Sequence, residues 1–460
     1  MNDTRSKVQR QLELTFPDVR PGEAGKPAVG GIEPFVAASE PEQPVKHELS
    51  METICGESNF RHAWEHVRSG GKAAGVDGLS IDEAERVFWE QWPELRKQLL
   101  EGTYQPQPVR RHEIAKPDGG VRCLGIPTFI DRAIQQAVLY RLQPLIDPTF
   151  SDSSFGFRPR RSAHQAIEQA QRYQAEGYRW VVDLDLEKFF DRVHHDILMG
   201  LLAKRLTDRR LLRLLRAYLN AGVMIDGLVQ PSEEGTPQGG PLSPLLSNVM
   251  LDELDCELTR RGHRFVRYAD DCNIYVRSER AGHRVMQSVI RFVTKRLKLK
   301  VNEQKSAVAR PSQRKFLGYS FTSEPQPRLR IAPKALERFK AKVRELTQRT
   351  CGKSLDQVVT KLNEYLRGWR GYFGRCETPS VLDRLEQWLR HRLRSLVWKQ
   401  WKTGKNRTKQ LRARGIDERT ARMTGYSPKG CWPISASKPL HEALSNKFFE
   451  SIGLVRLRRA

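Results

Sequence analysis

Two adjacent carboxylates, Asp270 and Asp271, are the residues whose type and spacing most directly suggest chemistry. The β-branched and aromatic residues at 265–268 and 272–276 favour strands, which predicts that Ala269, Asp270 and Asp271 form the tight turn of a hairpin. Two carboxylates held at a rigid turn repel each other unless a cation lies between them, so they are candidate ligands for a divalent metal. A solvated turn without chemistry is the alternative interpretation, because Asp is an ordinary turn residue.

A second pair of carboxylates, Asp183 and Asp185, interrupts an apolar run at residues 180–186. Such runs are usually buried strands, and a buried Asp without a partner is energetically costly, which favours a ligand or catalytic role. Three carboxylates from two adjacent strands can hold two Mg²⁺ ions, roughly 3.5–4 Å apart, for in-line attack of a 3′-hydroxyl on the α-phosphate of a nucleotide. Between the two pairs, Gln238 beside Gly239 would let an amide approach a flat ligand closely, although a plain loop also explains this stretch.

The positive charge of the chain is concentrated in its C-terminal third. The net charge is +25, of which residues 328–460 contribute +21 and residues 1–327 only +4. A nearly neutral body followed by a basic segment is typical of a protein that binds a polyanion. We expect nucleic acid rather than anionic lipid, because neither terminus has the amphipathic character of a membrane anchor.

The composition argues against several other classes of protein. Hydrophobic residues make up 38 % of the chain, no apolar run is long enough to span a bilayer, and the polar N-terminus lacks a secretion signal. A cytoplasmic protein without a membrane partner is therefore expected. The seven cysteines are scattered and lack paired spacing, which supports neither a disulfide framework nor a zinc module.

Periodicity and chain breakers predict the elements that position these residues. Residues 1–50 hold repeated prolines and glycines and are expected to form a disordered leader. A β-hairpin that carries Arg110, Lys116 and Arg122 is predicted at 104–126. Apolar residues at helical spacing predict helices at 129–145, 163–175, 198–219, 245–258 and 281–299, and the pattern is helical from residue 333 onward. Beyond 333 aromatic residues are interleaved with arginines, a composition that suits RNA; most of the aromatics would be core and the arginines would face the ligand.

A series of short motifs, taken in order, resembles the bacterial group II intron-encoded reverse transcriptase/maturase family over nearly all of residues 51–410. The motifs are Gly75-Val76-Asp77-Gly78, the region from Ile126-Pro127 to Gln136, Ser154-Phe155-Gly156-Phe157-Arg158-Pro159, Asp183-Leu184-Asp185 through Phe190-Asp191, Gly235-Thr236-Pro237-Gln238-Gly239-Gly240, Tyr268-Ala269-Asp270-Asp271, Lys305 and Phe316-Leu317-Gly318. Residues 366–373 look like the thumb or maturase (X) helices of that family.

The resemblance implies an α+β fold with the right-hand arrangement of a polymerase. Fingers and palm with an antiparallel sheet would occupy residues 51–325, and an all-helical thumb/maturase domain residues 326–410. Residues 411–460 would form a short basic segment capable of DNA binding. Many members of the family end in an H-N-H endonuclease with paired cysteines, and the segment after Tyr426 lacks that spacing, so a member without endonuclease is expected.

The resemblance also implies roles for individual residues. Asp185, Asp270 and Asp271 would be the catalytic carboxylates and the ligands of two Mg²⁺ ions. Asp183 competes for the first position, but the family motif sets the ligand five residues before the aromatic Phe190, which selects Asp185. Phe190 would exclude a 2′-hydroxyl, and Gln238 would line the base-pair pocket. Triphosphate contacts would come from Arg110, Lys116 or Arg122, and primer or template contacts from Tyr268, Lys305 and Gly318. The implied RNA contacts are Arg367, Trp369, Arg370, Arg390, Arg392 and Arg394.

The function implied is that of an RNA-directed DNA polymerase. It would bind group II intron RNA, assist the splicing of that RNA as a maturase, and copy it by target-primed synthesis. Its partners would be intron RNA, target DNA and dNTPs. The protein would associate with the nucleoid when it binds DNA, and it could form a homodimer. Two alternatives stay open: a domesticated or defence-associated reverse transcriptase without an intron, and an RNA-binding splicing factor with an inactive palm.

Overall fold

The computed structural model describes residues 46–115, 119–225, 228–230, 234–236, 239–350 and 352–458. Most of the leader expected at residues 1–50 therefore lies outside the described residues, as do Lys116, Gln238 and the side chain of Arg122. Within the described part of the chain, no helix combines the length and the apolar character that crossing a bilayer requires.

An N-terminal helical layer packs around one long helix, α5. Its aromatic core includes Phe60 and Trp64, whose rings both contact the ring of Phe88. A capping box starts α3 at Ser80, since the Ser80 hydroxyl accepts from the Glu83 amide and the Glu83 carboxylate accepts from the Ser80 amide. The helices of this layer are α1 (Met51–Ile54), α2 (Glu57–Ser69), α3 (Ile81–Glu90), α4 (Trp92–Glu101) and α5 (Phe129–Ile146).

A first sheet, in the order β2-β1-β4-β5, extends from this layer. The hairpin predicted at 104–126 is confirmed by the antiparallel pairing of β1 and β2, in which Arg110 lies across from Ile126. Strand β4 runs parallel to β1, and β5 pairs antiparallel with β4. The strands are β1 (Val109–Ala115), β2 (Val121–Ile126), β4 (Val223–Ile225) and β5 (Leu228–Gln230).

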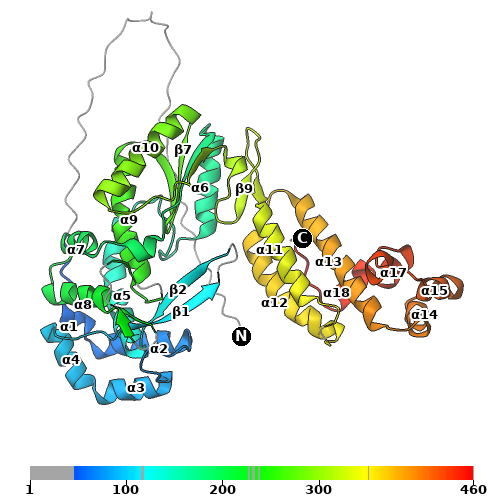
Figure 1. Ribbon diagram of the computed structural model, residues 1–460, viewed down its shortest axis with the longest axis horizontal. Helices are drawn as coiled ribbons and strands as arrows, with labels where there is room; N and C mark the ends of the chain where they lie inside the picture. Colours follow the sequence, from blue (N-terminus) through cyan, green and yellow to red (C-terminus); the bar gives the residue numbers. More distant parts are fainter. Residues whose placement is uncertain are drawn as a thin grey trace, which may run out of the picture. The chain divides into compact units, whose positions relative to one another are not determined.

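The central sheet, in the order β6-β7-β3-β8, is antiparallel throughout (Figure 1). Alternate residues face opposite layers, as a strand requires. Val181 and Tyr275 pack with the α6 layer, whereas Val182 and Ile274 belong to the large core that contains α9 and α10. The elements are β3 (Trp180–Leu184), β6 (Arg264–Tyr268), β7 (Asp271–Val276), β8 (Ala307–Ala309), α6 (Ala163–Ala175), α9 (Ser243–Arg260) and α10 (Glu279–Arg296).

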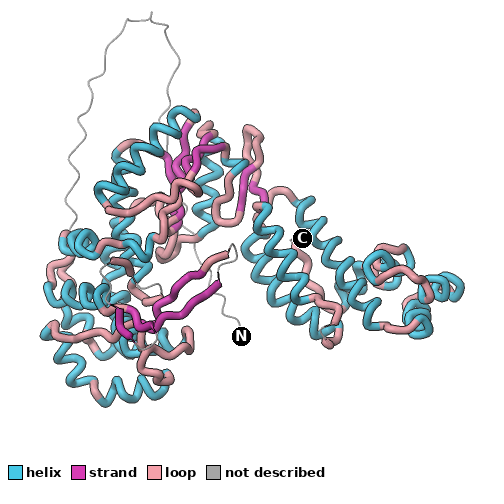
Figure 2. Tube along the Cα trace, viewed as in Figure 1, coloured by secondary structure: helices cyan, strands magenta, loops and turns pink. Residues whose placement is uncertain are grey.

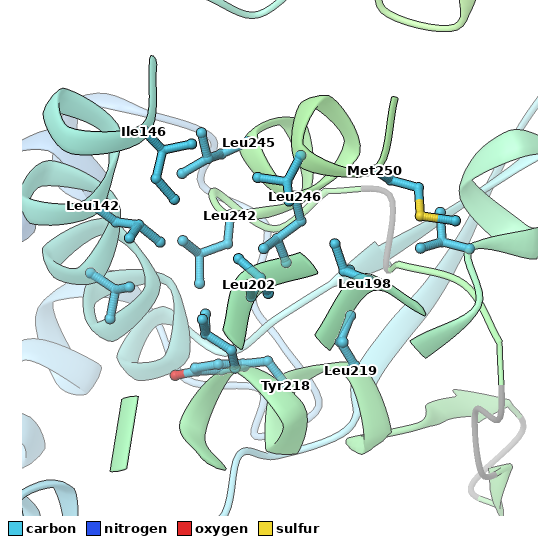
Figure 3. Close-up of a cluster of buried hydrophobic side chains, with 14 of the residues drawn as sticks. Leu142, Ile146, Leu198, Leu202, Tyr218, Leu219, Leu242, Leu245, Leu246 and Met250 are labelled. Carbon is cyan, nitrogen blue, oxygen red and sulfur yellow. The ribbon is translucent and has the colours of Figure 1, made fainter. Parts of the chain in front are cut away.

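Four helices converge on an apolar cluster that supports the central sheet. Figure 3 shows Leu142 of α5, Leu198 of α7, Leu219 of α8 and Met250 of α9 within this cluster, and all four are essentially inaccessible to solvent. The single helix predicted at 198–219 is wrong, because the chain breaks between α7 (His195–Ala203) and α8 (Arg209–Asn220). Asp208 starts the second helix by accepting from the backbone amides of Arg210 and Leu211.

The C-terminal part begins with a small hairpin and continues as helices alone (Figure 2). Its core is separate from the central cluster and includes Phe339, Trp369 and Trp398. The strands are β9 (Tyr319–Phe321) and β10 (Leu329–Ile331); the helices are α11 (Pro333–Leu346), α12 (Leu355–Phe373), α13 (Pro379–Gln400), α14 (Gly404–Arg412), α15 (Glu418–Gly425), α16 (Cys431–Ile434), α17 (Lys438–Ala443) and α18 (Asn446–Ser451).

Candidate active site

The hairpin predicted around Asp270 is present and has a two-residue turn. Tyr268 at the end of β6 pairs with Asp271 at the start of β7, so Ala269 and Asp270 form the tip. Ala269 adopts a left-handed conformation with φ of 56°, which is unfavourable for a residue with a Cβ. The turn therefore needs support from its surroundings to keep this shape.

The pairing of β3 with β7 brings Asp185 toward the same turn. In the observed register Asp183 lies across from Asn273 and Leu184 across from Cys272. Continuing this register by one residue sets Asp185 across from Asp271, where side chains of an antiparallel pair are roughly 4.5–5.5 Å apart at Cβ. The backbone of Asp185 is fixed by Ser306, whose hydroxyl accepts from the Asp185 amide at 3.0 Å.

Negative charge is concentrated at the end of the central sheet that carries Asp185 and Asp271. Burial, with added repulsion from Asp183, Asp270 and Asp185, raises the pKa of Asp271 to about 8. The four carboxylates thus form one electrostatic cluster, and a divalent cation is the group that would relieve their repulsion. In the described part of the chain no three acidic, His or Cys side chains are already close enough to hold an ion, so binding would draw these side chains together. The donor set fits Mg²⁺, which prefers carboxylate oxygens.

Asp183 and Asp185 differ in their partners. The guanidinium of Arg314 donates to Asp183 through Nε at 2.7 Å and forms an ion pair through Nη2 at 2.5 Å. The carboxylate of Asp185 is 41 % exposed, and the Lys305 ammonium lies 3.8 Å from it. Asp183 is thus neutralised by a protein cation, whereas Asp185 remains accessible to an ion from solution, which favours Asp185 as the first ligand.

A fully buried arginine, Arg267, supports the turn from the protein interior. Its guanidinium pairs with the buried Asp255 through Nη2 at 2.5 Å, and Nη1 donates to the carbonyl oxygen of Ala269 at 2.9 Å. It also donates to Asn248 and to Ser154, at 3.0 Å and 2.7 Å. A bidentate guanidinium with every donor directed inward holds its neighbours in a fixed geometry. The strained turn carbonyl is therefore held by a charge-assisted hydrogen bond.

The loop that contains Gly156 packs against the other side of the turn. The Phe155 amide donates to the Arg267 carbonyl at 2.9 Å, and the Arg267 amide donates to the Ser153 carbonyl at 2.9 Å. A Cβ on Gly156 would collide with the backbone of Ala269. Only glycine permits this approach, so the motif around Ser154 and the Asp270 turn are one structural unit.

Phe190 and the glycine-rich loop are brought together. The Thr236 amide donates to the Phe190 carbonyl at 2.7 Å, and Gly235 lies against the same backbone. Phe190, which is half-buried, and Thr236, which is buried, line a cavity of about 290 Å³ whose far wall includes Leu124 and Gly125 of β2. The cavity lies between the first sheet and the segment that follows β3, where an incoming nucleotide was expected.

The other expected primer and nucleotide residues are spread over three places. Lys305 is exposed beside Asp185, and Tyr268 is half-buried at the turn. Gly318, with φ of 82°, lies against the Phe373 ring of α12, which suits packing better than a primer contact. Arg110 is exposed on β1.

The expected RNA-binding residues divide into buried and accessible groups. Trp369 is 8 % exposed and stacks between Phe339 and Phe373, and Arg394 is 4 % exposed and donates to the Leu444 carbonyl. Burial removes Trp369 and Arg394 from the expected RNA surface. The accessible or partly accessible members are Arg367, Arg370, Arg390 and Arg392, of which Arg390 pairs with Glu386.

Two functional candidates, Arg267 and Arg314, were missed by sequence reasoning. Arg267 had a detectable signal, because it is a charged residue within the apolar run of β6, the same argument that singled out Asp183 and Asp185. Arg314 had none, since it lies in a short polar stretch more than 100 residues from Asp183.

Comparison with known proteins gives two family matches and several relatives. Residues 114–321 match the family described as reverse transcriptase (RNA-dependent DNA polymerase), and residues 336–415 match the group II intron maturase-specific domain. Protein YkfC of Escherichia coli (strain K12) is 41 % identical over 197 residues, which are 42 % of this chain and 51 % of that protein. Group II intron-encoded protein LtrA of Lactococcus lactis subsp. cremoris is 32 % identical over 323 residues, 56 % of this chain and 54 % of that protein.

The chain thus spans about half the length of these relatives. The matches confirm the family expected from the ordered motifs. Together with the antiparallel central sheet and the helical C-terminal part they confirm the α+β polymerase fold. Because a reverse transcriptase domain is followed by a group II intron maturase domain, the chain belongs to the group II intron reverse transcriptase/maturase family.

Proposed function

We propose that the protein is an RNA-directed DNA polymerase whose nucleotidyl transfer takes place at Asp185, Asp270 and Asp271. The observation that carries the proposal is the concentration of carboxylates at one end of the central sheet, where burial together with repulsion from Asp183, Asp270 and Asp185 raises the pKa of Asp271 to about 8. When bound, two Mg²⁺ ions would lower the pKa of the attacking 3′-hydroxyl and neutralise the leaving pyrophosphate.

The residues of the chain would hold and orient the reactants. Asp185 would approach the ions from the end of β3, and Asp270 and Asp271 from the turn that Arg267 supports. Lys305 would contact a primer phosphate; its 71 % exposed ammonium beside Asp185 supports this proposal. Primer extension by the purified protein on an RNA template with Mg²⁺ tests the proposal, and a lack of Mg²⁺-dependent extension would refute it.

We further propose that the substrate of the C-terminal helices is group II intron RNA, bound for splicing and for copying. The match of residues 336–415 to a maturase-specific domain and the net charge of +21 on residues 328–460 support this. Splicing of a precursor RNA in the presence and absence of the protein, with primer extension measured in parallel, separates the maturase role from the polymerase role.

Phe190 is proposed to exclude ribonucleotides. Replacing Phe190 by Val should lower the preference for dNTPs over rNTPs by about 10–100-fold, because the lost ring leaves room for a 2′-hydroxyl, and steric selection of this size is typical of such pockets. Single-nucleotide incorporation gives kcat/KM for each substrate. The rate with dNTPs serves as the control, and an unchanged ratio would remove Phe190 from the sugar pocket.

The accessible arginines of α12 are proposed to contact RNA phosphates. Replacing both Arg367 and Arg370 by Gln should weaken RNA binding and reduce the slope of log affinity against log salt by about 0.7–0.9 per lost contact, since each contact releases a counterion. Fluorescence anisotropy across a salt series measures both quantities. Arg61→Gln combined with Arg260→Gln, at two exposed arginines that pair with Glu57 and Glu257, removes the same two charges and is the control. A slope equal to that of the control would contradict the assignment.

A further inference from the structure

A cationic cavity in the C-terminal helical part has no role in the function described above. It measures about 280 Å³ and lies where the end of α11, the chain after it, α13 and α16 meet. Its volume is near the lower end of the roughly 300–1,000 Å³ that small-molecule sites occupy. The six lining residues are Arg344, Arg349, Trp388, Arg392, Ser395 and Trp432.

Three guanidinium groups line this cavity without an acidic partner. Among the described residues no carboxylate lies within ion-pair distance of Arg344, Arg349 or Arg392. Burial and the nearby charges of Arg344 and Arg349 lower the pKa of Arg392. Uncompensated positive charge around a cavity attracts an anion, and guanidinium groups match the geometry of phosphate in particular.

Two of the three guanidinium groups are held in place before any ligand arrives. Arg344 and Arg392 lie over the Trp388 ring, with their Cζ atoms 5.7 Å and 5.5 Å from the centroid. Arg392 Nε also donates to the Thr347 hydroxyl at 2.9 Å. Cation–π contacts and this hydrogen bond fix both side chains at little further entropic cost when a ligand binds.

The cavity also offers an aromatic face and an unused hydroxyl. Trp432 is 41 % exposed, with one side against the His391 ring at a centroid distance of 3.9 Å. Ser395 is 1 % exposed, and within the described residues its hydroxyl has no hydrogen-bond partner, which is costly for a buried polar group. A ligand with a flat ring, an anion and a hydrogen-bonding group would satisfy all of these features.

We propose that this cavity captures one unstacked nucleotide of a single strand, with its base on Trp432 and its phosphate on Arg344, Arg349 and Arg392. Stacking on aromatic side chains combined with arginine–phosphate contacts is the usual way in which proteins hold single strands. The inference rests on the proposed function, because it names the form in which nucleic acid is held by the maturase domain.

Two substitutions at exposed positions separate the base contact from the phosphate contact. Arg349→Gln should weaken binding of a ten-nucleotide single-stranded oligoadenylate about 10-fold and reduce the salt slope by about 0.7. Trp432→Leu should weaken binding at least about 5-fold, the effect of losing one stacked base, and leave the salt slope unchanged. Arg384→Gln, at an exposed position of α13 that does not line the cavity, removes the same charge and is the control.

The measurement is fluorescence anisotropy of the full-length protein with the labelled oligoribonucleotide and with its deoxyribonucleotide counterpart. Tighter binding of the ribonucleotide would assign the cavity to RNA, and equal or tighter binding of the deoxyribonucleotide would assign it to a DNA strand. If Arg349→Gln and Trp432→Leu both bind like Arg384→Gln, the proposal is overturned. Primer extension by the same proteins tests the polymerase proposal separately. If the wild-type protein extends primers and both cavity variants bind the oligonucleotide normally, the nucleotide-binding role of the cavity is refuted and the polymerase proposal is not.

Discussion

Asp185→Asn is expected to reduce primer extension at least about 1,000-fold, whereas Asp183→Asn should reduce it less than about 10-fold. The larger loss corresponds to roughly 4 kcal/mol of transition-state stabilisation, the scale of removing a charged metal ligand. Asp185 lies at the register position across from Asp271 and is accessible to an ion. The carboxylate of Asp183 is already paired with Arg314 at 2.5 Å, so it has less negative charge to offer a cation.

The two variants are matched controls for each other, because they make the same change two residues apart. The assay is steady-state primer extension at a series of Mg²⁺ concentrations, with near-UV circular dichroism to verify the fold. Asp185→Asn should also shift the Mg²⁺ dependence to higher concentration if any activity survives. The reverse ranking, with Asp183→Asn the more damaging, would assign the first ligand to Asp183.

Arg267→Met is expected to lower the local free energy of unfolding of the central sheet by about 3–5 kcal/mol. The substitution leaves Asp255 as a buried charge without its partner, and breaking a buried ion pair from one side has this order of cost. It also leaves the Ala269 carbonyl and the Asn248 side chain without their shared donor. We therefore expect the turn that carries Asp270 to loosen before the rest of the protein unfolds.

Native-state amide exchange of peptides covering residues 264–276 measures this local stability directly, because a chain with several cores does not unfold in one step. The expected cost corresponds to a loss of protection of roughly 100- to 1,000-fold or more. Arg260→Met is the control: Arg260 is exposed and pairs with Glu257 on the surface of α9, so its loss should change stability by no more than about 1 kcal/mol. Equal protection in the two variants would show that Arg267 does not support the turn.

Much of the fold could be predicted because local signals agreed with tertiary packing. The hairpin at 104–126 and the turn at Ala269–Asp271 follow from alternation and turn residues, and the helices at 129–145 and 163–175 from apolar spacing. The helix predicted at 198–219 was wrong because its apolar spacing continues across a break. The signal for that break was Asp208, a strong N-cap residue whose side chain accepts two helix amides.

The site was predictable only where chemistry and pattern coincided. An Asp in an apolar strand stands out from sequence alone, but the partner that distinguishes Asp183 from Asp185 is Arg314, and only the tertiary fold brings it near. Similarly, composition could not separate Trp369 and Arg394, which face the core, from Arg367, which faces solvent, because all lie on helices rich in both residue types. Residues that act through long-range contacts are the ones that sequence reasoning missed.

The close packing of Gly156 on the Ala269 turn limits how the sequence of this protein can diverge. Because Gly156, Asn248, Arg267 and Ala269 form a closed ring of contacts, a substitution at any one of them changes the space or the hydrogen bonds available to the two residues that it touches. A protein with a substitution at only one of these positions would therefore be poorly active, and substitutions would have to occur at several of the positions together. The motif around Ser154 and the Asp270 turn, which are more than 100 residues apart, would then be inherited as one unit.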